Sequence, residues 1–139
     1  MDQCLSKIRK LIQKLDLALS LLRRPRGLEL FSTARLPQPT HFDAEVMTGN
    51  LIQLHWVAKM IDFPSFFSSI PDDFPIVWTL HDLNPLTGGC HYTNGCDAFS
   101  TQCMHCPQLR NGNKRDLASR TFQIKQDAYR GKNLHLVAD

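Results

Sequence analysis

Two histidines follow apolar runs that have the composition of buried strands. His55 lies near the end of the run 51–57, and His81 closes the run 74–81, directly before Asp82. An imidazole titrates near neutral pH and can donate a hydrogen bond to a phosphate or sugar oxygen. His81 is therefore the main candidate for a functional residue, and His55 and Asp82 are candidate substrate-binding residues. The structural alternatives are that each histidine only satisfies its neighbours and that Asp82 caps the following turn.

A long loop, residues 82–115, follows His81. It greatly exceeds the usual connection of about 2–6 residues between a strand and a helix. Gly88 and Gly89 have no side chain, so the backbone there could approach a ligand closely, and both are candidate substrate-binding residues. A plain turn is the simpler explanation of the same two glycines.

Four of the five cysteines of the chain lie in this loop. They are separated by five, six and two residues: Cys90, Cys96, Cys103 and Cys106. The last spacing is typical of half of a tetrahedral zinc site, and His91 or His105 could replace one thiol as a ligand. A structural zinc would hold a loop that lacks regular structure. Disulfide bonds and buried free thiols are the alternatives.

The elements that position these residues alternate between apolar runs and helical patterns. We expect strands near 51–57, 74–81 and 133–138, and helices near 63–70 and 116–130. Such alternation predicts an α/β fold with a Rossmann-like parallel sheet. Ligands bind such sheets outside the carboxyl ends of the strands, which is where the two histidines are expected to meet.

We interpret residues 1–27 as a basic amphipathic helix and residues 28–139 as a partial α/β domain. The apolar residues of the helix recur at helical spacing: Leu5, Ile8, Leu11, Ile12, Leu15, Ala18, Leu19 and Leu22. Basic residues crowd the same stretch: Lys7, Arg9, Lys10, Lys14, Arg23, Arg24 and Arg26. The apolar face could pack on the domain, or residues 4–24 could contact an anionic membrane surface.

Composition restricts the class of protein. The chain has 139 residues, a net charge of +3 and 42% apolar residues, close to an ordinary soluble protein. No run of about 18 apolar residues is present, and charges interrupt any signal-peptide core, so we expect a cytoplasmic location, with membrane association as an option. Lys and Arg are absent from residues 82–109, which argues against a nucleic-acid partner.

The combined string of residues 51–109 resembles the N-terminal, acceptor-side domain of GT-B glycosyltransferases of group 1 (family 4). Leu-Ile-Gln-Leu-His-Trp-Val at 51–57 and Ile-Val-Trp-Thr-Leu-His-Asp at 76–82 are similar to two strands of that domain. Thr-Gly-Gly-Cys-His-Tyr at 87–92 and Cys-Pro-Gln-Leu at 106–109 are similar to the cysteine-bearing loop of one branch. That branch includes enzymes of cell-surface polysaccharide synthesis.

This resemblance implies a two-domain enzyme that transfers a sugar, with retention, from a sugar nucleotide to a glycan or lipid-linked acceptor. No metal or other cofactor is required for catalysis. His81 matches a histidine that faces the cleft and contacts the donor sugar or its phosphate, and is therefore the candidate catalytic residue. Gln102 and Met104 depart from the family pattern, which tends toward a glycine near the cysteine pair.

Two parts of the family's pattern are missing from this sequence. One is the C-terminal half, through which the sugar nucleotide would bind, and the other is the glycine-rich loop that follows the family's first strand. We therefore expect a partial N-terminal domain that is inactive alone. The alternatives are a small zinc-stabilised binding module and an inactive remnant without transfer activity.

Overall fold

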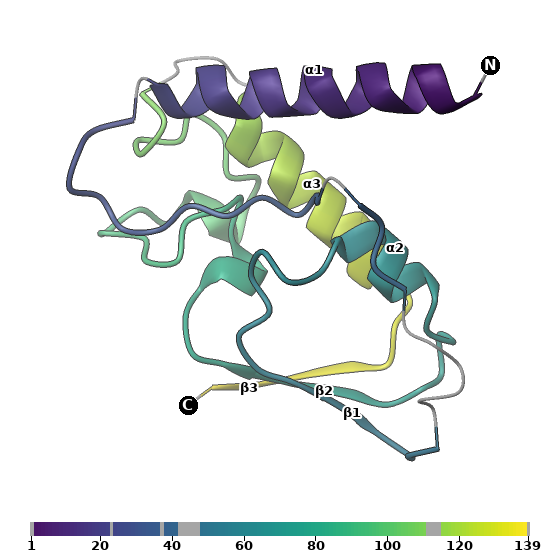
Figure 1. Cartoon of the computed structure of the whole chain (residues 1–139). Helices are drawn as coiled ribbons and strands as arrows, with labels where there is room; N and C mark the ends of the chain where they lie inside the picture. Colours follow the sequence, from purple (N-terminus) through teal and green to yellow (C-terminus); the bar gives the residue numbers. More distant parts are fainter. Residues whose placement is uncertain (1, 23, 37, 42–47, 111–114, 139) are drawn as a thin grey trace.

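The computed structural model describes residues 2–138 except 23, 37, 42–47 and 111–114. Its elements follow in the order α1 (Asp2–Leu22), β1 (Ile52–Leu54), α2 (Phe63–Ser68), β2 (Ile76–Leu80), η2 (Asn84–Leu86), η3 (Ala98–Ser100), α3 (Leu117–Tyr129) and β3 (Leu134–Ala138), where η denotes a 3-10 helix. Three layers result: the sheet, then α2 and α3 on one face, then α1 across α3 (Figure 1). Arg23 of the predicted basic helix and residues 111–114 of the predicted loop lie outside the described residues.

The three strands form one parallel sheet in the order β1-β2-β3, which confirms the predicted α/β fold. Ile76 at the start of β2 pairs with Ile52 on one side and Leu134 on the other. β1 is shorter than the expected 51–57. The carbonyl of His55 accepts a hydrogen bond from the indole of Trp78 at 2.7 Å instead of extending the ladder. β2 is the central strand, so the residues that follow it lie between the ends of both neighbours.

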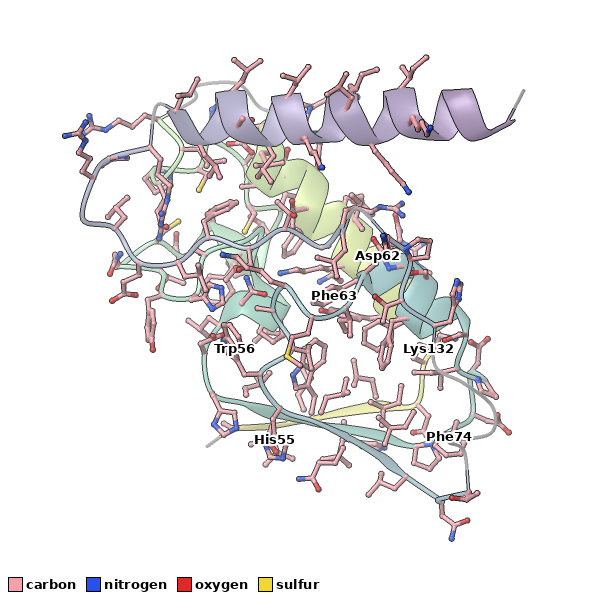
Figure 2. The ribbon with its side chains drawn as sticks, in the orientation of Figure 1. His55, Trp56, Asp62, Phe63, Phe74 and Lys132 are labelled. Atoms are coloured by element: carbon pink, nitrogen blue, oxygen red, sulfur yellow. The ribbon has the colours of Figure 1, made fainter. Side chains whose placement is uncertain are left out.

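An aromatic cluster fills the space between the sheet and the helices. Phe63 and Phe67 of α2, Trp78 of β2 and Tyr129 of α3 have ring centroids 5.1–6.1 Å apart. Phe63, Phe67 and Trp78 are almost completely buried, and Figure 2 shows Phe63 in this middle layer. Each aromatic pair at such distances adds about 0.5–1.5 kcal/mol beyond its buried area. The cluster therefore holds α2 and α3 against the central strand.

Aspartates begin both helices that cover the sheet. Asp62 accepts a hydrogen bond from the backbone N–H of Ser65 at 3.2 Å, and Asp116 accepts one from Ser119 at 2.8 Å. Each bond satisfies one of the amide groups that lack a partner in the first turn. Gly131, with a φ of 77°, follows the end of α3. The predicted start and end of this helix are confirmed.

α1 contacts the rest of the protein through one narrow side. Its residues Leu17 and Leu21 pack against a second apolar cluster. That cluster consists of Phe31, Leu109, Leu117 and Ala118. The outer apolar side chains of α1 are 49–76% exposed: Ile8, Leu11, Ile12, Leu15, Leu19 and Leu22. Figure 2 shows side chains along the outer side of α1 projecting away from the other layers. No helix within the described residues is long and apolar enough to cross a membrane.

Replacing Asp62 by alanine should lower the free energy of unfolding by about 2 kcal/mol. The buried carboxylate accepts bonds from the Ser65 hydroxyl at 2.8 Å and the Leu36 N–H at 3.0 Å, besides the helix cap. Asp127→Ala is the control, because Asp127 pairs with Arg130 on the exposed surface and should change stability by less than about 0.5 kcal/mol. Urea unfolding measures both. Equal effects would contradict the role of the cap.

Candidate functional site

The carboxyl edge of the sheet brings His55 and His81 together. Nδ1 of His55 lies 3.0 Å from Nε2 of His81, and the rings stack with centroids 5.3 Å apart. Both side chains are exposed. The hollow beside them has a volume of only about 10 Å³, so the pair stands on an open surface rather than in a closed pocket. Binding of substrate by the two histidines stays a prediction.

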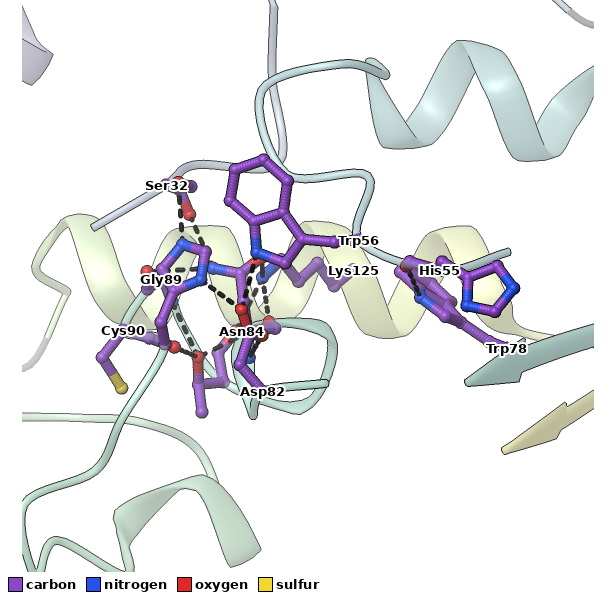
Figure 3. A network of polar contacts seen from close by, with 11 residues as sticks. Ser32, His55, Trp56, Trp78, Asp82, Asn84, Gly89, Cys90 and Lys125 are labelled. Atoms are coloured by element: carbon purple, nitrogen blue, oxygen red, sulfur yellow. Dashed lines mark hydrogen bonds and ion pairs between the residues drawn. The ribbon is translucent and has the colours of Figure 1, made fainter. Parts of the chain in front are cut away.

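Asp82 follows His81 in the chain, and its carboxylate is hydrogen-bonded to other groups of the protein (Figure 3). Oδ2 accepts hydrogen bonds from Nε1 of Trp56 at 2.8 Å and from Nδ1 of His91 at 2.5 Å. Oδ1 accepts one from the N–H of Asn84 at 2.8 Å, which caps the turn after β2. The side chain of Asp82 is 7% exposed. A bond to substrate from this predicted substrate-binding residue would therefore have to compete with three existing donors.

His91 extends the network toward the N-terminal segment. Its Nε2 lies 2.9 Å from Oγ of Ser32, while its Nδ1 faces Asp82. A serine, a histidine and an aspartate in this order match the arrangement that activates a nucleophilic hydroxyl. Ser32, however, is only 2% exposed and His91 only 3%. The chain of contacts is therefore suited to fixing the orientation of Asp82, not to attack on a substrate.

Lys125 ties the turn after β2 to helix α3. Its ammonium group donates hydrogen bonds to the carbonyl and the Oδ1 of Asn84 and, at 3.1 Å, to the carbonyl of Thr87. Burial lowers the pKa of Lys125 to about 7, against the opposing effect of the nearby Cys90 and Cys103 thiols and of Asp82. The buried amine of Lys125, bonded to backbone oxygens, holds the turn in one position relative to the helix.

Gly88 and Gly89, both predicted to bind substrate, are buried at the junction between the loop and the rest of the protein. A Cβ atom on Gly88 would lie 2.3 Å from the carbonyl oxygen of Ala118 in α3. A Cβ atom on Gly89 would lie 2.5 Å from the ring of Phe31, and its φ of 140° also favours glycine. Close packing thus accounts for both glycines, and their contact with substrate stays a prediction.

Gly88→Ala should destabilise the fold by about 3 kcal/mol or more, because the atom that it meets is backbone and cannot rotate away. Gly49→Ala is the matched control, since the nearest atom to its added Cβ is 3.8 Å away. Its effect should stay within about 1 kcal/mol. Thermal melting of both variants beside the wild type tests this prediction. A Gly88→Ala protein as stable as Gly49→Ala would show that the loop and α3 are not in contact.

The four loop cysteines surround one small cavity. Cys90, Cys96, Cys103 and Cys106 all line it, together with Phe31, Gly88 and Ala118 among others. None of them forms a disulfide bond. Burial raises the pKa of the Cys103 and Cys106 thiols to about 11, and it raises that of Cys90 as well. Within the described residues, no three His, Cys, Asp or Glu side chains are placed to hold an ion as they stand. Zinc therefore stays a prediction at this point.

Four residues of the network were not selected from the sequence as site residues: Ser32, Trp56, Asn84 and Lys125. A usable signal existed for one of them. Lys125 follows the buried Thr121 by four positions, so it falls on the face of α3 that packs inward, where an unpaired lysine is rare. Ser32 belongs to an irregular segment, and nothing in its neighbours indicates a partner at His91.

Over about half of its length the chain is related to a glycosyltransferase. The relative is a protein of Escherichia coli (strain K12) named as a colanic acid biosynthesis glycosyl transferase, WcaC. It is 49% identical over 68 residues, which cover 48% of this chain and 17% of the relative. No protein-family model matches the chain. No solved structure matches it either.

Proposed function

We propose that this chain forms part of the acceptor-side domain of a retaining GT-B glycosyltransferase in polysaccharide synthesis. The similarity to a glycosyltransferase supports the class. The parallel sheet, with His55 and His81 side by side at the carboxyl edge of β1 and β2, supports the location of the cleft. The paired histidines are the observation that carries the proposal, because they place two polar rings where such sheets receive ligands.

In the proposed reaction the bond between the anomeric carbon and the donor phosphate oxygen breaks, an acceptor hydroxyl oxygen bonds to the anomeric carbon, and the hydroxyl proton passes to the departing phosphate oxygen. Negative charge grows on that phosphate before the proton arrives. A hydrogen bond from the His81 imidazole to that oxygen, or to the donor sugar, is stronger in the transition state than in the ground state. His55 holds the His81 ring at Nε2 and so fixes its orientation. The sugar nucleotide itself binds through a second, donor-side domain.

The acceptor in this proposal is a glycan or a lipid-linked glycan, and a cavity remote from the histidine pair, which shares no lining residue with the hollow there, could hold an anionic part of it. This cavity of about 330 Å³ lies between α1, α3 and residues 33–36. Its basic lining residues are Lys10, Lys14, Arg35 and Arg120, and none of the described residues that line it is acidic. Leu17 and Leu117 add apolar surface to the same cavity. Cationic groups above apolar walls fit an anionic amphiphile, and the exposed outer face of α1 fits the surface of an anionic membrane.

Replacing His81 by alanine in the full-length enzyme that carries this segment should lower kcat/KM at least tenfold. Loss of one donor to a developing charge typically costs about 10²–10³ in rate. The melting temperature should barely change, because the His81 side chain is exposed. His55→Ala is the companion variant and should show a smaller effect, since His55 acts through His81.

The paired measurement separates function from structure. A His81→Ala enzyme of normal stability and near-normal activity would remove the catalytic assignment. Sugar transfer by the purified 139-residue chain alone would contradict the acceptor-side assignment. A full-length product with no detectable transfer would instead favour a zinc-stabilised binding module or an inactive remnant.

Replacing Leu15 and Leu19 of α1 by glutamate should weaken binding to vesicles that contain phosphatidylglycerol at least tenfold. Burying each leucine contributes about 1.5–3 kcal/mol to insertion, and both side chains are more than half exposed. Met60→Glu is the control, because Met60 is 64% exposed but lies outside α1. Co-sedimentation measures the binding. Equal binding by all three proteins, or none by the wild type, would oppose a membrane role for α1.

A further inference from the structure

The cavity between the loop cysteines has the size of a single ion. Its volume is about 20 Å³, which is enough for one water-sized particle. Four sulfur-bearing residues from distant positions in the loop surround it: Cys90, Cys96, Cys103 and Cys106. Four thiols that line one small void supply the donor set of a structural zinc site.

A backbone amide already points at one of these sulfur atoms. The N–H of Gly88 donates to Sγ of Cys103 at 3.2 Å. Hydrogen bonds from amides favour the charged thiolate over the neutral thiol, which gains little from them. The backbone is therefore arranged for a thiolate at Cys103.

The turn between Cys103 and Cys106 is built for close approach of its two ends. Cys103 and His105 both have positive φ values, 51° and 55°. Non-glycine residues take up this region at a cost, and such positions often mark ligand sites. The N–H of Cys106 is held by Asp116 at 2.9 Å, so the turn is anchored to the start of α3.

Neither nearby histidine competes for the ligand positions. Both ring nitrogens of His91 are engaged, one by Ser32 and the other by Asp82. His105 is exposed and does not line the cavity. The ligand set that remains is four sulfur atoms, which is the closed tetrahedral set of structural zinc sites. In Figure 3 the Cys90 sulfur points away from the polar network, so the two groups are separate.

We propose that Cys90, Cys96, Cys103 and Cys106 bind one structural Zn²⁺ ion in this cavity. Each thiol releases its proton to solvent and forms one bond to zinc of about 2.3 Å. Within the described residues the four side chains do not stand ready to hold an ion, so binding requires them to move. Four thiolates leave a net negative charge on the site, and the protonated form of Lys125, which bonds to the adjoining turn at Thr87, would offset part of it.

The proposed ion would hold the loop that supports Asp82. Cys90 lies directly between His91, which contacts Asp82, and the two glycines that pack on α3 and Phe31. Fixing Cys90 by a metal bond therefore also limits where His91 can lie. This inference does not rest on sugar transfer, and a binding module with the same loop would hold zinc in the same way.

Metal content of the whole chain, purified under reducing conditions, tests the proposal. Mass spectrometry of the metal should find about one zinc ion per chain in the wild type and less than about one tenth of that in Cys103→Ser and Cys106→Ser. Cys4→Ser is the matched control, because Cys4 lies in α1, and it should keep its zinc. Zinc retained in both loop variants would overturn the assignment of ligands.

Two measurements on the wild type do not depend on the folding of variants. Removal of metal by a chelator should lower Tm by ~10 °C or more, and added zinc should restore it. Cobalt in place of zinc should give the visible absorption of a tetrahedral thiolate site. The proposal would be overturned if the untagged chain contained no metal, its Tm did not change with the chelator and its loop thiols reacted freely with an alkylating reagent. A disulfide among these cysteines in the reduced preparation would do the same.

Discussion

The carboxylate of Asp82 is the contact on which the site depends. It joins the indole that follows β1, the turn that follows β2 and the imidazole of the cysteine-bearing loop, all within 2.8 Å. Three donors surround one nearly buried carboxylate, and each would be left unsatisfied if it were removed. His81 precedes Asp82 by one residue. The position of the exposed imidazole is thus set by a buried carboxylate as well as by its own contacts.

Two independent cores flank this contact. The aromatic cluster around Trp78 holds the sheet to α2 and α3, while the cluster around Leu109 joins the loop, α3 and α1. Lys125 and Asp116 connect them, because both reach from α3 to loop backbone. The loop is consequently anchored at several points, although the only regular structure in its described part is two short 3-10 helices. Such anchoring is what a surface that positions a substrate requires.

Sequence patterns predict the strands and helices well because burial leaves a periodic trace. The parallel order, the cap at Asp116 and the neighbouring positions of His55 and His81 all follow from apolar runs and their ends. The contact between His91 and Ser32 could not be predicted, since it joins two irregular segments with no periodicity between them. The packing role of Gly88 and Gly89 could not be predicted either. A glycine that must lack a side chain looks the same in the sequence whether its neighbour is a ligand or a helix.

The sheet carries its described helices on one face only (Figure 1). On β3, Leu136 and Val137 point to opposite faces of the sheet, and both remain almost half exposed, whereas parallel sheets in globular proteins are normally covered on both sides. Exposed apolar side chains on an edge strand favour contact with another apolar surface. Self-association through this strand would select the folded state, so the apparent thermal stability of the chain would then depend on protein concentration.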